Sequence, residues 1–306
     1  MTGAGCRENS VVIVAPNAGG YASTAAANIG ARVIYADVDP VTHLLNVDSL
    51  GSSISSEVDA IVVTHLYGNV ADVGQIRRTC QRFDIRIIED CAQAAGADFQ
   101  GRMVGSLGDV AAFSFYPTKN LAGIGDGGAV SSNNSEIMKS VRILSQYGWT
   151  SPYVISESQG MNSRLDEIQA TVLRIGLSRL QELNGLRRAI IRKYEIAVED
   201  TTLSMVTSAA ENSAAHLAVV LASDSAEREN LRERCRSAGI QTSVHYPILD
   251  NHQVGLPSPL AEVALPIAEN ACLRIFTIPC FPDLRDDEVS RICAVLAGSV
   301  RQGNNV

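Results

Sequence analysis

The chain has 306 residues, of which 25 are Lys or Arg and 33 are Asp or Glu, so its formal net charge is −8. With 46% hydrophobic and 19% charged residues, the composition is typical of a globular protein and excludes a disordered chain. The acidic balance argues against nucleic acid or an anionic membrane surface as the main partner, and no apolar run approaches the roughly 20 residues of a membrane helix.

Short β-branched runs alternate with helix-like stretches through the first half of the chain. Buried strands are predicted at Val11–Val14, Arg32–Tyr35, Ala60–Thr64 and Arg86–Ile88, and helices at Tyr21–Ile29 and Val73–Phe83. This alternation indicates right-handed βαβ crossovers and a mainly parallel sheet. Two further strands, Ala111–Phe115 and Ala129–Ser132, are predicted on either side of a Gly-rich turn.

A long helix is predicted after this sheet. The sequence Ser163-Arg-Leu-Asp166 fits a capping box in which the Ser163 hydroxyl accepts from a free backbone N–H. One helix face then carries apolar residues: Leu165, Ile168, Val172 and Ile175. The helical pattern resumes at residues 187–199.

The remaining elements predict a second, smaller unit. They are a strand at His216–Ala222 and helices at Ala226–Ser237 and Asp286–Leu296. We therefore expect an α/β fold in which residues 1–178 form a large domain with a mainly parallel central sheet, and residues 179–306 a small C-terminal α+β domain. The last six residues, RQGNNV, are expected to be loosely held.

Seven cysteines occur without any CxxC pair. This pattern is typical of reduced, packed thiols and excludes a zinc ribbon or a disulfide-stapled secreted domain. The amino terminus also lacks the apolar run of a signal peptide. We expect a cytoplasmic protein.

The stretch from Ile87 to Gly128 holds most of the residues that could carry chemistry. Asp90 follows a buried strand, where open α/β sheets present ligand-binding groups. Lys119 lies in a loop after another strand, flanked by Ser114 and a run of glycines. Desolvation or neighbouring cations can lower the pKa of such a lysine and make it a nucleophile for aldehydes. An acidic residue facing it could keep the ring nitrogen of pyridoxal phosphate protonated.

Each of these residues also has an ordinary structural explanation. A single loop lysine is usually solvated, and an Asp at a strand end is more often a cap or turn residue. Gln93 alone is an unremarkable polar residue. The run Gly123-Ile-Gly-Asp-Gly-Gly128 matches GxGxxG, but a strand-like segment follows it instead of a helix. We therefore reject a dinucleotide-binding fingerprint and expect a tight turn beside the lysine.

Several motifs in order give the chain a more specific resemblance. They are HLYGNVADV (65–73), IIEDCAQAAGA (87–97), GSLGDVAAFSFYPTKNLAGIGDGGAV (105–130), YGW (147–149), MNSRLDEIQATVLRIGL (161–177) and SVHYPI (243–248). Together they span nearly the whole chain, which resembles the sugar aminotransferases of the DegT/DnrJ/EryC1/StrS family. These are pyridoxal-phosphate enzymes of fold type I, in the aspartate aminotransferase superfamily.

The resemblance implies roles for individual residues around the cofactor. Lys119 would bind pyridoxal phosphate covalently and later carry the proton between the substrate carbon and the cofactor. Asp90 would pair with the protonated pyridine nitrogen. Gln93 would lie near the cofactor ring and its hydroxyl, and Ser114 would donate a hydrogen bond to the phosphate.

The resemblance also implies residues at the edge of the site. Asn162 would reach the phosphate of the neighbouring subunit, so the active site would require a homodimer. His245 matches a position at the mouth of the site and is expected to contact substrate. The second histidine that usually follows HYP is displaced here, with His252 as the nearest candidate, and we assign it no role. His43 and His216 are expected to be surface or strand residues and not ligands.

The implied reaction moves an amino group from glutamate or glutamine to a nucleotide-linked keto-deoxysugar. A lysine at position 119 favours this transamination, because the dehydratase branch of the family has a histidine there. No metal site is expected, and the resemblance leaves open the sugar, the keto carbon and the nucleotide.

The chain departs from the family at its amino terminus. Only residues 1–10 precede the first matching strand, and they lack the Gly-Thr turn that binds the cofactor phosphate in the family. Three explanations are open: a fragment of a normal enzyme, a short form that takes this segment from a partner chain, or a catalytically impaired paralogue that acts through association.

Overall fold

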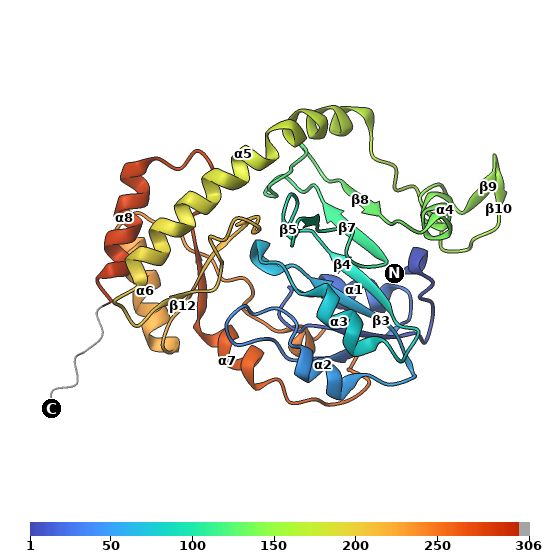
Figure 1. Cartoon of the computed structure of the whole chain (residues 1–306), viewed down its shortest axis with the longest axis horizontal. Coiled ribbons are helices and arrows are strands. Elements are labelled where there is room, and N and C mark those ends of the chain that lie inside the picture. Colours follow the sequence, from blue (N-terminus) through green and yellow to red (C-terminus); the bar gives the residue numbers. More distant parts are fainter. Residues whose placement is uncertain (300–306) are drawn as a thin grey trace.

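A six-stranded sheet forms the centre of the larger part of the molecule in the computed structural model, which describes residues 1–299 (Figure 1). The strand order is β2-β1-β3-β4-β7-β8, and all neighbours are parallel except β7 and β8. The strands are β1 (Val11–Val14), β2 (Arg32–Tyr35), β3 (Val58–Thr64), β4 (Arg86–Asp90), β7 (Val110–Ser114) and β8 (Gly128–Ser131). In the sheet, β2 lies on one side of β1 and β3 on the other. The connections that leave the carboxyl ends of β1 and β3 therefore run in opposite directions, and a crevice forms between them.

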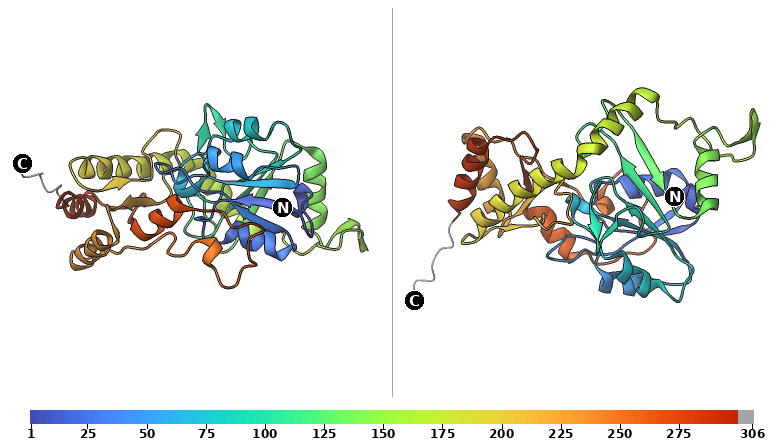
Figure 2. Two further views of the ribbon diagram at one scale, coloured as in Figure 1. Left: turned by 90° about the horizontal axis from the view of Figure 1, so that it is seen from below. Right: turned by 45° about the horizontal axis from the view of Figure 1, so that its top comes forward.

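Helices cover the sheet on both faces, with α1 on one side and the pair α2 and α3 on the other (Figure 2). These are α1 (Tyr21–Asn28), α2 (Val47–Ser53), α3 (Val73–Cys80) and, beyond β8, α4 (Ser135–Leu144). The shorter elements here are η1 (Thr2–Ala4), η2 (Leu66–Gly68), β5 (Asp98–Phe99), β6 (Arg102–Met103), β9 (Trp149–Ser151) and β10 (Val154–Ile155).

The long helix α5 (Glu167–Val198) runs from the central sheet to a second, smaller sheet (Figure 1). That antiparallel sheet contains β11 (Ser204–Met205), β12 (Ala218–Leu221) and β13 (Ile275–Ile278). The remaining helices are α6 (Ser225–Ser237), η3 (Asp250–His252), α7 (Pro266–Arg274) and α8 (Asp286–Ala297). Fully buried Ile191, Tyr194 and Phe276 join α5 to this sheet in one apolar core.

The predicted strands and fold class are confirmed, with strand ends within two residues of those expected. The predicted domain boundary near Arg179 lies inside the continuous helix α5 and stays a prediction. The predicted interruption before residue 187 is wrong, because α5 runs unbroken to Val198. Residues 301–306, which are expected to be loosely held, lie outside the described residues.

The predicted capping box is also wrong. Asp166 is the N-cap of α5, and its Oδ1 accepts from the backbone N–H of Gln169 at 2.8 Å. Ser163 lies three residues earlier, where its own N–H donates to the carbonyl of Ser145. An aspartate placed directly before the helix satisfies the free N–H group, so the serine is not needed for it.

All seven cysteines are free, and Cys6, Cys80, Cys91 and Cys235 are buried, which confirms the prediction of packed thiols. No helix in residues 1–299 is both long enough and apolar enough to cross a membrane.

A buried carboxylate connects the segment after α6 to the start of α1. Asp250 Oδ1 accepts from the N–H of Gly20 at 2.7 Å, and Oδ2 accepts from the Ser23 hydroxyl at 2.6 Å. The Asp250 N–H donates to the carbonyl of Pro16. Burial raises the pKa of Asp250 to about 6, although its two hydrogen bonds act in the opposite direction.

Replacing Asp250 with Asn should therefore change how stability depends on pH. A raised native pKa means that the carboxyl stabilises the fold fully below its ordinary value of 3.8 and loses this contribution as pH rises through about 6. The free energy of unfolding of the unmodified chain, minus that of Asp250→Asn, should fall by about 2 to 3 kcal/mol across this range. Urea unfolding at a series of pH values measures it, and a difference independent of pH would contradict the raised pKa.

Candidate functional site

A cavity of about 770 Å³ opens at the carboxyl ends of the parallel strands. Its wall is built from residues that end or follow β1, β3, β4 and β7, together with residues directly before β12 and in the segment before η3. The residues that line it are Ala18, Tyr21, Thr64, Leu66, Asp90, Ala92, Gln93, Ala112, Phe113, Ser114, Tyr116, Thr118, Lys119, Asp126, His216, Leu217, His245 and Tyr246. The cavity lies where ligands bind in open α/β sheets.

Asp90 is the last residue of β4 and places its carboxylate in this cavity. Oδ1 accepts from the N–H of Ala92 at 3.0 Å, and the Thr64 hydroxyl lies 3.4 Å from Oδ2. Burial raises the pKa of Asp90, and no cation of residues 1–299 forms an ion pair with it. The site therefore contains an acidic group that gains from a cationic partner in the cavity.

Lys119 lines the same cavity from the loop between β7 and β8. The backbone N–H of Lys119 donates to the carbonyl of Tyr116 at 2.8 Å. The loop closes where the backbone N–H of Gly123 donates to the carbonyl of Phe115. Burial lowers the pKa of Lys119, while the charge of Asp90 acts in the opposite direction. A lowered pKa increases the fraction of neutral amine, which is the nucleophilic form.

Gln93 and Ser114 also line the cavity, as predicted from the motifs. Gln93 Oε1 accepts from the N–H of Tyr67 at 2.6 Å, and its Nε2 donates to the Tyr246 hydroxyl at 3.0 Å. One end of this amide is therefore anchored on the backbone of Tyr67, and the other end holds Tyr246 at the cavity. The Ser114 oxygen accepts from the N–H of Tyr116 at 3.3 Å, which leaves the hydroxyl hydrogen for another acceptor.

His245 also lines the cavity, and its Nδ1 is 2.9 Å from the Thr277 hydroxyl. Burial lowers the pKa of His245, and the positive charge of Lys119 lowers it further. Next to it, the Tyr246 ring packs so closely on Gly19 that a Cβ there would meet the ring at 2.7 Å. A glycine is needed at position 19, where φ is also positive.

The structure thus brings together five of the six predicted site residues, and Asn162 is the exception. It is exposed outside the cavity, and its Oδ1 accepts from Arg164 Nε at 3.0 Å.

Two histidines differ from expectation. His43 is buried at 2% exposure and is not on the surface. His216 is buried in the cavity wall, two residues before β12. No local motif indicates His216, because Asn120, the residue that its side chain contacts, is distant in the sequence. Tyr246, by contrast, could have been found from the HYP motif that contains it.

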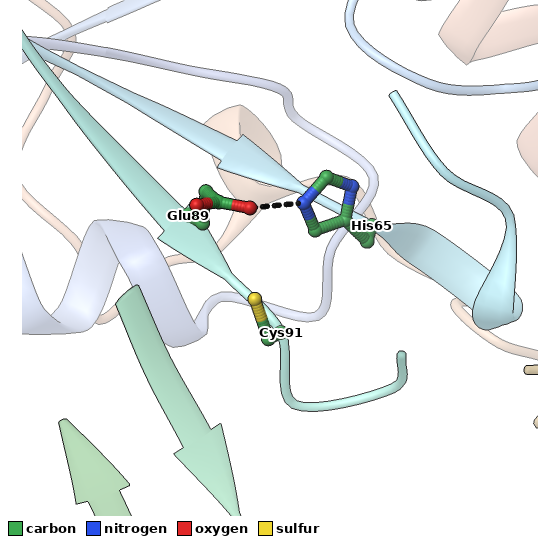
Figure 3. Close-up of side chains that lie close together, drawn as sticks. All are labelled: His65, Glu89 and Cys91. Carbon is green, nitrogen blue, oxygen red and sulfur yellow. Dashed lines mark hydrogen bonds and ion pairs between the residues drawn. The ribbon is translucent and has the colours of Figure 1, made fainter. Parts of the chain in front are cut away.

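A second cluster of titratable groups lies in the core beside this cavity: His65, Glu89 and Cys91 (Figure 3). The side chains of His65 and Glu89 have no exposed surface, and Nε2 and Oε2 are 3.0 Å apart. The other ring nitrogen, Nδ1, accepts from the N–H of Ala71 at 3.1 Å. Nε2 must therefore carry the proton that His65 donates to Glu89.

Glu89 accepts three more hydrogen bonds, all from one loop. The donors are the backbone N–H groups of Gly105 at 2.9 Å, Leu107 at 2.8 Å and Gly108 at 2.6 Å. Burial acts to raise the pKa of Glu89, but these bonds and that from His65 outweigh it and hold the pKa below its ordinary value. Because the ring nitrogens and carboxylate oxygens are already committed, the cluster is a structural connection and not a ready metal site.

Replacing Glu89 with Gln should strongly destabilise the protein. In the unmodified chain both carboxylate oxygens accept from backbone N–H groups. Either orientation of the glutamine amide would therefore place its NH₂ group, itself a donor, against another N–H donor. We expect a loss of about 3 kcal/mol in the free energy of unfolding, measured in urea. Glu57→Gln, at an exposed position, is the matched control. A chelator should leave the melting temperature of the unmodified chain unchanged, and a metal-dependent melting temperature would contradict the structural role.

Comparison with known proteins agrees with this geometry. The model of the DegT/DnrJ/EryC1/StrS aminotransferase family matches residues 1–297. The chain is 34% identical over 304 residues to a dTDP-3-amino-3,4,6-trideoxy-alpha-D-glucose transaminase of Micromonospora megalomicea subsp. nigra, covering 95% of this chain and 80% of that protein. It is also 34% identical over 268 residues to a UDP-N-acetyl-3-dehydro-alpha-D-glucosamine 3-aminotransferase of Acidithiobacillus ferrooxidans, covering 88% and 72%.

Among solved structures, NtdA from Bacillus subtilis with bound cofactor PMP superimposes with a TM-score of 0.89 at 25% sequence identity. The match covers 98% of this chain and 70% of that one. The family match and these relatives show that the chain belongs to the DegT/DnrJ/EryC1/StrS aminotransferase family.

Proposed function

We propose that the chain is a pyridoxal-phosphate-dependent aminotransferase that moves an amino group from glutamate or glutamine to a nucleotide-linked keto-deoxysugar. The observation that carries this proposal is the placement of Lys119 and Asp90 in one cavity. Burial lowers the pKa of the lysine and raises that of the aspartate. Groups whose pKa values are displaced in this way are typical of catalytic sites.

The residues present fit pyridoxal phosphate. The Asp90 carboxylate lacks an ion-pair partner among residues 1–299 and suits a protonated ring nitrogen. The free hydroxyl hydrogen of Ser114 suits a phosphate oxygen. When bound, the cofactor supplies an electron sink for the carbon from which a proton is removed.

The side chains of the chain supply the remaining steps. Lys119 would hold the cofactor through its Nζ, and as a free amine it would take a proton from one substrate or cofactor carbon and return it to the other. Asp90 would pair with the ring nitrogen of the cofactor and keep it protonated. Gln93 fixes Tyr246 over the cavity, so the tyrosine and His245 limit the space in which the substrate lies.

The names of the relatives indicate the substrate class. One acts on a dTDP-linked amino sugar and another on a UDP-linked one, so we propose a nucleotide-linked sugar without choosing the base. The alternative of an impaired paralogue is not favoured, because the relatives are named as sugar transaminases and Lys119, Asp90 and Ser114 line one cavity here. The seven free thiols support a cytoplasmic location for the reaction.

We also propose that the enzyme is a homodimer in which Asn162 completes the partner's site. In the sequence, Asn162 lies between two segments with exposed apolar side chains, the β9–β10 hairpin and the first turns of α5. On the hairpin, Tyr153 is 86% and Ile155 66% exposed. On α5, Ile168 and Ile175 lie two turns apart on one face and are 67% and 64% exposed. Apolar side chains gathered this way favour a protein partner.

The two half-reactions of the transfer can be measured separately. The chain loaded with pyridoxal phosphate and mixed with L-glutamate should release 2-oxoglutarate in an amount equal to the bound cofactor, and a ketosugar nucleotide should then be aminated. Lys119→Ala should release none. Asp90→Asn should lower the rate at least about a hundredfold, whereas Asp84→Asn, at an exposed position outside the cavity, should match the unmodified chain.

If a chain that binds the cofactor released no 2-oxo acid from either glutamate or glutamine, the proposed function would be wrong.

The dimer has its own test. Ile168→Asp should raise the dimer dissociation constant at least about tenfold in sedimentation equilibrium, because it places a charge in an apolar contact. Ile196→Asp changes an equally exposed residue of α5, 67% accessible, at the far end of the helix and should leave the constant unchanged. Equal effects of the two substitutions would contradict the proposed interface.

A further inference from the structure

His216 has a fixed orientation in the cavity wall because of Asn120. The Asn120 amide donates from Nδ2 to the carbonyl of Ala214 at 2.7 Å and to Asn184 Oδ1 at 2.8 Å. A backbone carbonyl only accepts, so the atom of Asn120 that faces it must be Nδ2 and the amide cannot be flipped. Its Oδ1 then faces Nδ1 of His216 at 2.8 Å. Nδ1 therefore carries the proton.

The surroundings also keep this imidazole neutral. Burial lowers the pKa of His216 well below its ordinary value, and Lys119, Arg187 and His245, each positively charged when protonated, act in the same direction. Arg187 Nη1 donates to the carbonyl of His216 at 3.1 Å. No carboxylate of residues 1–299 forms an ion pair with Arg187, so its charge is not neutralised beside the ring.

A neutral ring with its proton on Nδ1 has a lone pair on Nε2. Within the described part of the chain Nε2 has no hydrogen-bond partner, although His216 lines the cavity together with Lys119 and His245. A group that binds there must donate a hydrogen bond to it. Because Arg187 is cationic and lies against the backbone of His216, an ammonium donor is repelled, whereas a neutral hydroxyl is not.

We propose that His216 belongs to the substrate-binding wall of the cavity, and that its Nε2 accepts a hydrogen bond from a hydroxyl group of the sugar bound beside Lys119. This proposal rests on the proposed function, since it requires a sugar in the cavity. Asn120 then has a positioning role, because it fixes the proton of His216 on the side away from the ligand.

Nuclear magnetic resonance of the holoenzyme labelled with ¹⁵N-histidine tests the geometry directly. The His216 signals should show a protonated Nδ1 and an unprotonated Nε2 at neutral pH. Saturating dTDP-glucose or UDP-glucose, whichever binds, should move the Nε2 resonance upfield, and dTDP or UDP alone should not. A proton on Nε2, or an Nε2 resonance that a saturating nucleotide sugar leaves in place, would overturn the proposal.

Binding to variants gives an independent measurement. His216→Asn keeps an amide that can face Asn120 but lacks an atom at the Nε2 position. Its dissociation constant for the nucleotide sugar, measured by calorimetry, should rise about tenfold, while that for the nucleotide alone stays unchanged. His43→Asn is the matched control, since His43 is also buried but does not line the cavity. Equal affinity of His216→Asn and the unmodified chain for the sugar would overturn the proposal.

The visible absorbance of the lysine-bound cofactor separates this result from a failure of the proposed function. It should be the same in His216→Asn as in the unmodified chain. Absence of this band from the unmodified chain, or failure of both nucleotide sugars to bind, would contradict the proposed function itself.

Discussion

Two adjacent carboxylates at the end of β4 face opposite sides of the sheet, and the site depends on the difference between them. Glu89 points into the core, where His65 and three backbone N–H groups satisfy it completely. Asp90 points into the cavity without a cationic partner among residues 1–299. Because side chains alternate along a strand, fixing the first carboxylate also fixes the direction of the second. The buried Glu89 carboxylate therefore orients the Asp90 carboxylate that lines the cavity.

Lys119 is placed by a second set of polar contacts, which are partly buried. Asn120, its neighbour in sequence, bonds to Asn184 of α5 and to His216 before β12. Asn184 in turn donates to the carbonyl of Ala95, in the segment after β4. The loop that carries the lysine is thus held between the central sheet and the smaller one. Buried amides with all their partners in place rigidify such a connection.

The sequence predicted the strands well, because β-branched runs such as Val11–Val14 are typical of a buried parallel sheet. Asp90, Gln93, Ser114, Lys119 and His245 were found from motifs, and the structure places them in one cavity. The start of α5 was misassigned because both Ser163 and Asp166 suit an N-cap, and only the position of the chain decides between them. The roles of Glu89 and His216 depend on partners distant in sequence, so no local pattern could have indicated them.

Lys119 is proposed to hold pyridoxal phosphate in this cavity. The most direct measurement is reduction of the cofactor-loaded chain with borohydride, followed by mass mapping of the labelled peptides. We predict that the label lies on Lys119 and that Lys119→Ala shows neither the label nor the visible absorbance band. A label on another lysine, or no label on a folded chain mixed with excess pyridoxal phosphate, would contradict the account.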